Sequence, residues 1–256
     1  SKALLHAYGI PTVETRSVGG VNEALRAADA IGFPVALKIL SPQILHKTDV
    51  GGVALHLRNA DEVRAAADRL LQQVARLRPH APVRGFTVQQ MAVRPGARAL
   101  ILGLTCDPVF GPVLLCGSGG VEVELHRRHA VALPPLNAEL ASDLLTRSGV
   151  RPLLGAWRSR PAADEHAVID SLLRLSQLAC DLAGVAELDI NPLLVDAQGV
   201  IALDARVRLH RDGARPAQLA IRPYPQELET TLRVDGQDLL RRPIRPEEGE
   251  RLREVY

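Results

Sequence analysis

The chain has few of the residues that mark several protein classes. Aromatic residues make up 3% of its 256 residues, and cysteine occurs only at Cys106, Cys116 and Cys180. An odd number of cysteines without a CxxC pair predicts buried free thiols in a reducing cytoplasm. No apolar run approaches the roughly 18 residues of a membrane span, so no membrane partner is expected. The net charge of +2 is too small to indicate nucleic acid as a partner.

Lysine is scarce in a different way. Of 31 basic residues, only Lys2, Lys38 and Lys47 are lysines. The planar fork of arginine cannot replace a compact ammonium group everywhere, so we expect lysine where a compact ammonium is needed. Lys38 and Lys47 lie within ten residues of each other, which marks this segment as a place to look for function.

The remaining composition, 46% hydrophobic and 23% charged, is that of an ordinary globular protein. At 256 residues we expect one large domain or two modest ones, because single cores stop growing near this size. Residues 1–85 predict a small α+β unit. Its expected elements are helices at 2–8, at 21–31 and after a capping box formed by Asn59 and Glu62, and strands at 35–40 and 53–57.

Residues 86–207 predict a second α+β unit. Short extended runs separated by turn signals fill residues 86–133 and indicate a mostly antiparallel sheet. They are followed by helices at 138–147 and 165–183, a strand at 186–190 that we expect to break at Pro192, and a hairpin.

The end of the chain has a different character. Residues 208–225 are polar, contain several prolines and are typical of a linker. Residues 226–256 predict a strand, an Asp235-Gly236 turn, a second strand and the start of a helix. Such a piece cannot bury a core alone, and the first residue is Ser1 rather than Met. We therefore expect a piece excised from a longer protein, with 226–256 as the truncated start of another domain.

A candidate metal site follows from the geometry of the hairpin near residue 195. Its turn, Asp196 to Gly199, is centred between residues 197 and 198, so symmetric pairing places partners whose numbers sum to 395. Asn191 then lies opposite Asp204, with Cβ atoms about 4.5–5.5 Å apart. Mg²⁺ prefers such oxygen ligands, with phosphates and waters completing its shell. The alternative is that both side chains are simply solvated, and a one-residue bulge would place them on opposite faces.

A second candidate site surrounds Lys38, which the strand alternation places opposite Val35, Leu37 and Ile39. A lysine in that position can contact nucleotide phosphates as a point charge. In the following loop, the amides of Gly51-Gly52 could approach an anion closely. His46 could accept a phosphoryl group, because imidazole is nucleophilic at neutral pH. The alternatives are an ordinary turn and an exposed histidine.

Three blocks of the sequence, taken together, resemble one family. ALKILSPQILHKTDVGGVAL resembles the nucleotide-binding motif of the ATP-grasp domain of ADP-forming acyl-CoA synthetases. FGPVLLCGSGGVEVE with HAVALPPLN resembles a second block of that family, and AELDINPLLV with ALDARV a third. Their order and spacing match over about residues 1–207. The tail, IRPYPQELE with LRRPIRPEE, resembles the junction at which certain bacterial protein lysine acetyltransferases pass into a GNAT domain.

The resemblance implies an ATP-grasp fold, in which two α+β subdomains clamp a nucleotide, with ATP or ADP and Mg²⁺ as cofactors. It implies that Lys38 contacts the phosphates and that Gly51-Gly52 form the phosphate-cradling turn. Gln90 and Met91 match the hinge strand that holds adenine through backbone groups.

The resemblance also implies roles for three further residues. Asn191 and Asp204 match the family's Mg²⁺ ligands, and His46 matches the histidine that passes phosphate between sites. Two positions depart from the family pattern: Ala99 replaces a glutamate and Arg128 an aspartate. These departures bring catalytic turnover into question more than nucleotide binding.

Two functional hypotheses follow. In the favoured one, the chain is a regulatory nucleotide-binding module of a bacterial acetyltransferase, with CoA-binding and GNAT domains in the same parent chain. In the other, it is the active phosphoryl-transfer part of an ADP-forming acyl-CoA synthetase. A carboxylate–amine ligase fits the fold but not the HKTDVGG block.

Overall fold

The computed structural model describes residues 1–44, 47–119, 129–158, 160–210, 219–221 and 228–244. The chain forms two compact units, each assembled from separate stretches of sequence. Unit 1 contains residues 1–99, 154–164 and 191–205; unit 2 contains residues 100–153, 165–190 and 206–256. In the described part of the chain, no helix combines the length and apolar character needed to cross a membrane.

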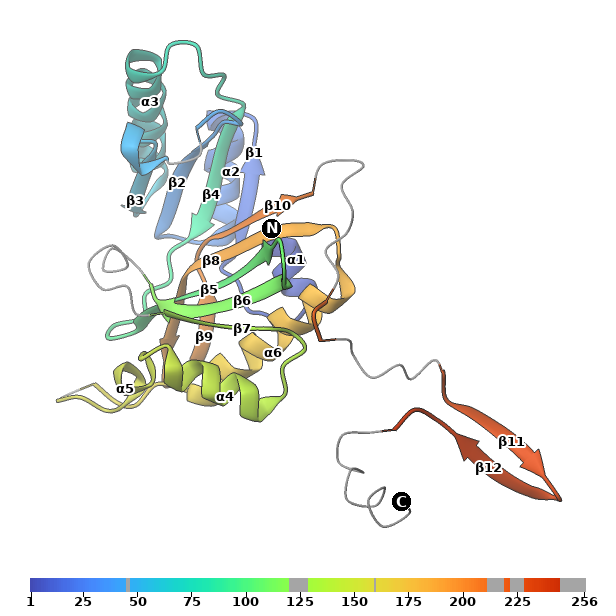
Figure 1. Ribbon diagram of the computed structural model, residues 1–256. Coiled ribbons are helices and arrows are strands. Elements are labelled where there is room, and N and C mark those ends of the chain that lie inside the picture. Colours follow the sequence, from blue (N-terminus) through green and yellow to red (C-terminus); the bar gives the residue numbers. More distant parts are fainter. Residues whose placement is uncertain (45–46, 120–128, 159, 211–218, 222–227, 245–256) are drawn as a thin grey trace. The chain divides into compact units, whose positions relative to one another are not determined.

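Unit 1 is built on a four-stranded antiparallel sheet with the order β1-β4-β2-β3 (Figure 1). Its strands are β1 (Thr15–Val18), β2 (Val35–Leu40), β3 (Val53–Leu57) and β4 (Gly85–Gln90). The boundary expected after residue 85 therefore falls too early for this sheet, because β4 pairs with both β1 and β2. The hairpin after residue 190 also belongs to unit 1, so the sequence boundary at 85 does not describe how the chain packs.

Two helices, α2 (Val21–Ile31) and α3 (Ala60–Leu77), contact this sheet and each other. Their apolar faces bury one face of the sheet in a core that includes Leu37, Ile39, Phe86 and Val88. The short helix α1 (Lys2–Ala7) precedes β1. Because side chains alternate along a strand, the residues between these core positions point to the other face.

The start of α3 confirms the expected capping box. Asn59 Oδ1 accepts a hydrogen bond from the N–H of Glu62 at 2.9 Å, and Glu62 Oε2 accepts one from the N–H of Arg58 at 2.8 Å. The return bond thus reaches the residue before the cap rather than the cap itself. Two leucines of α3, Leu71 and Leu77, remain partly exposed.

A second sheet has the order β10-β8-β5-β6-β7, and β9 pairs with β8. The pairings of β5 with β6 and of β6 with β7 are antiparallel, as predicted. The strand expected to break at Pro192 instead continues, because the Pro192 carbonyl still accepts a hydrogen bond from Leu203 N–H at 3.0 Å. The strands are β5 (Arg98–Asp107), β6 (Gly111–Ser118), β7 (His129–Ala132), β8 (Val185–Asp196), β9 (Gly199–Ala202) and β10 (Ala205–Leu209).

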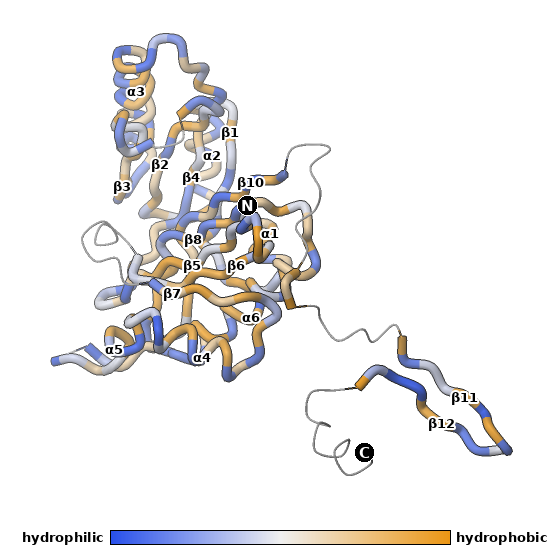
Figure 2. Tube along the Cα trace, viewed as in Figure 1, coloured by the Kyte–Doolittle hydropathy of each residue, from blue (hydrophilic) through white to orange (hydrophobic). Residues whose placement is uncertain are grey.

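In unit 2, α4 (Ala138–Arg147) contacts β6, β7 and α6 (Glu165–Asp181), which also contacts β6. The short α5 (Arg151–Leu154) follows α4. The trace is predominantly hydrophobic along β6 and β7 (Figure 2). Cys116 is buried there, and burial raises the pKa of its thiol to about 11. All three cysteines are free, as predicted, although Cys106 and Cys180 are only half-buried.

The expected hairpin near the C-terminus is present as β11 (Thr230–Val234) and β12 (Gln237–Arg241). Its turn residues, Asp235 and Gly236, have positive φ angles of 51° and 82°, as a type I′ turn requires. Every residue of both strands is exposed. The helix expected after them falls on residues 245–256, outside the described part of the chain.

Candidate functional site

The face of the first sheet opposite α2 and α3 carries a row of polar side chains. Thr87 lies between two neighbours in the register: Lys38 on one side and Ser17 on the other. One step further along β4, Gln89 pairs with Thr15. Lys38 is the half-buried residue of a β2 run whose neighbours Leu37 and Ile39 are buried. The alternation of the sequence therefore predicted the face of Lys38 correctly.

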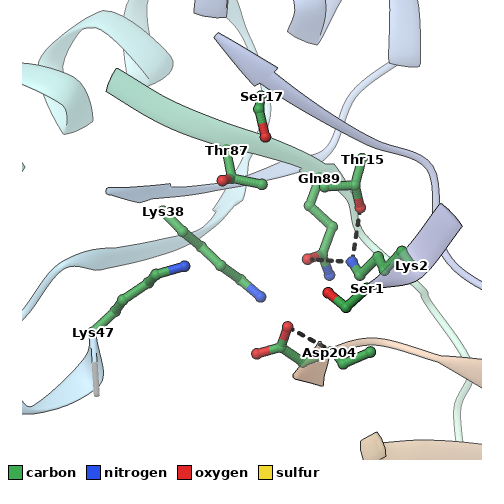
Figure 3. A pocket seen from close by; sticks show the side chains of 10 residues that line it. Ser1, Lys2, Thr15, Ser17, Lys38, Lys47, Thr87, Gln89 and Asp204 are labelled. Atoms are coloured by element: carbon green, nitrogen blue, oxygen red, sulfur yellow. Dashed lines mark hydrogen bonds between the residues drawn. The ribbon is translucent and has the colours of Figure 1, made fainter. Parts of the chain in front are cut away.

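A cavity of about 290 Å³ opens over this polar row, entirely within unit 1. Its volume lies near the lower end of the range for ligand pockets, about 300–1,000 Å³. Figure 3 shows three lysines and one aspartate around it. It is lined by Ser1, Lys2, Thr15, Ser17, Lys38, Lys47, Thr87, Gln89, Asp204 and Ala205.

All three lysines of the chain line this one cavity. Lysine scarcity pointed to Lys38 and Lys47, but sequence reasoning missed Lys2. The same signal could have found Lys2, had it been applied to all three residues instead of the two that are close in sequence.

The ammonium group of Lys2 is held by neutral oxygens. Nζ donates to Thr15 Oγ1 at 2.7 Å and to Gln89 Oε1 at 3.0 Å. Burial, followed by the charge of Lys38, lowers the pKa of Lys2 to about 8; Asp204 acts in the opposite direction and Lys47 adds to the lowering.

The register predicted for the 191–204 hairpin is confirmed. Leu193 pairs with Ala202 and Asp196 with Gly199, so partner numbers sum to 395 without a bulge. Beyond the last of these pairs, the N–H of Asn191 donates to the carbonyl of Asp204 at 3.3 Å. One oxygen of the Asp204 carboxylate accepts the N–H of Ala205 at 3.0 Å. The hairpin thus brings Asp204 to the lysine cavity with Asn191 beside it in the backbone pairing.

The chemistry of these two side chains fits Mg²⁺. Amide and carboxylate oxygens are hard ligands, and Mg²⁺ commonly takes only one or two carboxylates and completes its shell with phosphates and water. Within the described residues, no cluster of three or more His, Cys, Asp or Glu side chains could hold a metal by itself. The roles of Asn191 and Asp204 as metal ligands remain predictions.

The glycine turn is packed more tightly than the sequence suggested. Gly51 has a φ angle of 60°, and a Cβ atom on Gly52 would lie 2.7 Å from Ile39 Cγ1. The Gly51 N–H donates to the Thr48 carbonyl at 2.9 Å and the Gly52 N–H to the Lys47 carbonyl at 2.7 Å. Both expected amide donors are thus engaged within the turn, and they could hold a phosphate only if it opened.

The backbone N–H groups at the predicted adenine-binding position are also engaged in hydrogen bonds within the chain. The Gln90 N–H donates to the Glu14 carbonyl at 2.9 Å, and the Met91 N–H donates to the Pro34 carbonyl at 3.2 Å. Proline has no N–H to return, so the Met91 carbonyl receives no hydrogen bond from Pro34. The N–H groups of both residues are thus engaged with the chain itself, and the binding of adenine by this pair stays a prediction.

The remaining predicted residues fall into two groups. Ala99, which replaces a glutamate of the family pattern, lies in β5. His46 and Arg128 lie outside the described residues, so their predicted roles rest on the sequence alone.

The model of an ATP-grasp domain matches residues 1–209. The chain belongs to the ATP-grasp family. It is similar to the beta subunit of acetate–CoA ligase [ADP-forming] I from Pyrococcus furiosus, with 34% identity over 209 residues, 82% of this chain and 89% of that subunit. It is also 35% identical over 208 residues to 4-hydroxybutyrate–CoA ligase [ADP-forming] from Nitrosopumilus maritimus, of which it spans only 30%.

Solved structures agree on the fold. An acetyl-coenzyme A synthetase 1 from Ca. Korarchaeum cryptofilum, in complex with coenzyme A and Ca-AMPCP, superposes with a TM-score of 0.78 at 38% identity, covering 82% of this chain and 90% of that one. Another structure of that synthetase, with coenzyme A and Mg-AMPPCP, has its phosphohistidine segment pointing towards the nucleotide-binding site; its TM-score is 0.70 at 35% identity, with the same coverages. The expected ATP-grasp fold is therefore confirmed, and these relatives are acyl-CoA ligases from archaea rather than bacterial acetyltransferases.

Proposed function

We propose that this ATP-grasp chain is the phosphoryl-transfer part of an ADP-forming acyl-CoA ligase and binds ATP or ADP with Mg²⁺. The observation that carries the proposal is the cavity in unit 1, where every lysine of the chain gathers beside Asp204 on the polar face of the sheet. Polyphosphates are recognised by such point charges. The similarity to separate ligase beta subunits supports this reading over the acetyltransferase hypothesis.

In the proposed reaction, a nitrogen of His46 attacks the γ-phosphorus of ATP, the bond to the β–γ bridging oxygen breaks, and ADP leaves. Lys38 would hold the phosphates in line and stabilise the charge that spreads over the transferred group. Asn191 and Asp204 would hold Mg²⁺, which when bound neutralises phosphate charge. The phosphoryl group would then pass to a CoA-binding domain, carried by a partner subunit or by another part of a longer chain.

The regulatory hypothesis remains as a second candidate because of residues beyond the family match. The β11–β12 hairpin lies after residue 209 and exposes all of its strand residues, as the opening of a further domain would. Ala99 in β5 also takes the place of a glutamate in the family pattern, so the carboxylate of that position is missing. In this second candidate, the chain binds a nucleotide but does not transfer its phosphate, and the parent protein carries CoA-binding and GNAT domains. None of the relatives named above is described as an acetyltransferase.

The proposed function is tested by titrating ATP and ADP, with Mg²⁺, into the wild type and Lys38→Ala by calorimetry. A charge-assisted contact contributes about 1.5–3 kcal/mol, so the variant should bind roughly ten to a hundred times more weakly. Arg16→Ala is the matched control, because Arg16 also carries one positive charge in unit 1 but is exposed and paired with Glu14. Equal affinities for wild type and Lys38→Ala would contradict the proposal.

A further inference from the structure

Lys2 is positioned as a binding group rather than as half of an ion pair. A lysine ammonium has three N–H donors, and two of them are directed to the neutral oxygens of Thr15 and Gln89. The Thr15 hydroxyl itself donates to the Val13 carbonyl at 3.0 Å, so its oxygen serves as an acceptor for Lys2. Gln89 is almost fully buried, which fixes the second acceptor. The ammonium is thus held in place at the cavity by hydrogen bonds to neutral oxygens, which carry no full negative charge to neutralise it.

We propose that Lys2 is a third phosphate-binding residue of this cavity, acting with Lys38 and Lys47 on the polyphosphate of the nucleotide. The inference rests on the proposed function for the presence of a nucleotide, but adds a residue from α1 that the family motifs quoted above do not include. Its remaining N–H would donate to a phosphate oxygen while Thr15 and Gln89 keep the ammonium in position.

The charges around the cavity favour a ligand with several negative charges. Among the described residues that line the cavity, three carry ammonium groups and one, Asp204, a carboxylate. Like charges in a partly buried site repel one another at a cost that solvent screens only in part. A triphosphate removes this repulsion better than a monophosphate can, and an uncharged nucleoside does not remove it at all.

The pKa of Lys2 agrees with this geometry. It is lowered to about 8 by burial and then by the neighbouring Lys38 charge. An anion bound at the cavity favours the charged ammonium and raises the pKa again.

A purely structural role makes a different prediction. If Lys2 only tied α1 to β1 and β4 through Thr15 and Gln89, its loss would loosen unit 1 and weaken every ligand alike. A phosphate-binding role weakens only ligands with phosphate charge. The dependence of affinity on the number of phosphates therefore separates the two roles.

The experiment compares the wild type, Lys2→Met and the control Arg16→Met by calorimetry without Mg²⁺, using ATP, inorganic tripolyphosphate and adenosine as probes. We expect Lys2→Met to bind ATP and tripolyphosphate roughly tenfold more weakly, to bind adenosine as the wild type does, and Arg16→Met to change none of the three. Unchanged ATP affinity, or an equal loss for ATP and adenosine, would overturn the role of Lys2.

Two further measurements keep the test decisive. Lys2→Gln removes the charge but keeps an N–H donor for Thr15 and Gln89, so it replaces Lys2→Met if that variant does not fold.

In wild-type protein labelled with ¹³C-lysine, only three side chains give Cε signals, and tripolyphosphate should raise the lowest of the three lysine pKa values. A pKa that does not move would count against the proposal. If Lys38→Ala weakens ATP binding and Lys2→Met does not, the proposed function stands and this inference alone fails.

Discussion

Lys2 illustrates why an arginine-rich chain carries lysine at the cavity. A tetrahedral ammonium can reach Thr15, Gln89 and a ligand from one small centre. An arginine fork directs its donors in a plane and suits paired oxygens such as those of carboxylates. Elsewhere Arg151 donates from two guanidinium nitrogens to one oxygen of Glu165, Oε1, and holds the pKa of that carboxyl below its usual range.

The aspartate at the cavity provides a prediction about metal dependence. Asp204→Asn keeps the shape of the side chain but removes the charge that a divalent cation prefers. We expect ATP binding in the presence of Mg²⁺ to weaken about tenfold, and binding without Mg²⁺ to stay unchanged or to tighten slightly, because one negative charge near the phosphates is lost.

Calorimetry with and without Mg²⁺ measures both effects. Asp29→Asn, an exposed position in α2, is the control for the loss of one negative charge from unit 1. An equal loss of affinity with and without Mg²⁺ would assign Asp204 to folding or to direct nucleotide contact instead of metal binding.

Helix α3 allows a prediction about stability. Its cap residue Asn59 satisfies the otherwise unpaired N–H of Glu62, and loss of such a cap costs about 1 kcal/mol. Asn59→Ala should therefore lower the free energy of unfolding by about 1 kcal/mol. Denaturant titration followed by circular dichroism measures it, and Asn22→Ala, in the exposed first turn of α2, should have little effect. Two variants of equal stability would show that the cap does not contribute.

Local elements were the part of the fold that the sequence could predict. The hairpin register followed from its short turn, because a two-residue connection at 197 and 198 determines every later pair. The face of Lys38 followed from alternation along one strand. These inferences need only neighbours in sequence, for which the physical rules are strong.

Long-range assembly was the part that it could not predict. No local sequence pattern predicts that β4 pairs with β1 and β2, or that the hairpin after residue 190 belongs to unit 1. The two acceptors of the Lys2 ammonium, Thr15 and Gln89, are brought together by the pairing of two strands that are far apart in sequence. The sequence also could not show that the N–H groups of Gly51 and Gly52 form hydrogen bonds within their own turn, because a Gly-Gly pair reads the same in either case.

For the whole chain, the question that separates the two candidate functions is whether phosphate is transferred. We expect γ-labelled ATP with Mg²⁺ to leave an acid-labile phosphoryl group on the wild type, because His46, Lys38, Asn191 and Asp204 are all present. Label should be absent from His46→Ala, and phosphate analysis of the acid- and base-treated protein identifies the histidine linkage. A wild type that binds ATP but takes up no label would favour the regulatory module.

The gathering of every lysine into one cavity has a practical consequence for chemical labelling. Every side-chain amine of this chain lines that cavity, so a reagent that modifies lysine acts there. Because burial and the charge of Lys38 lower the pKa of Lys2 to about 8, a larger fraction of Lys2 is unprotonated near neutral pH than of an ordinary lysine. Among the lysines, a mild acylating agent should therefore react first at Lys2, and the mass of the peptide that contains Lys2 would report occupancy of the cavity.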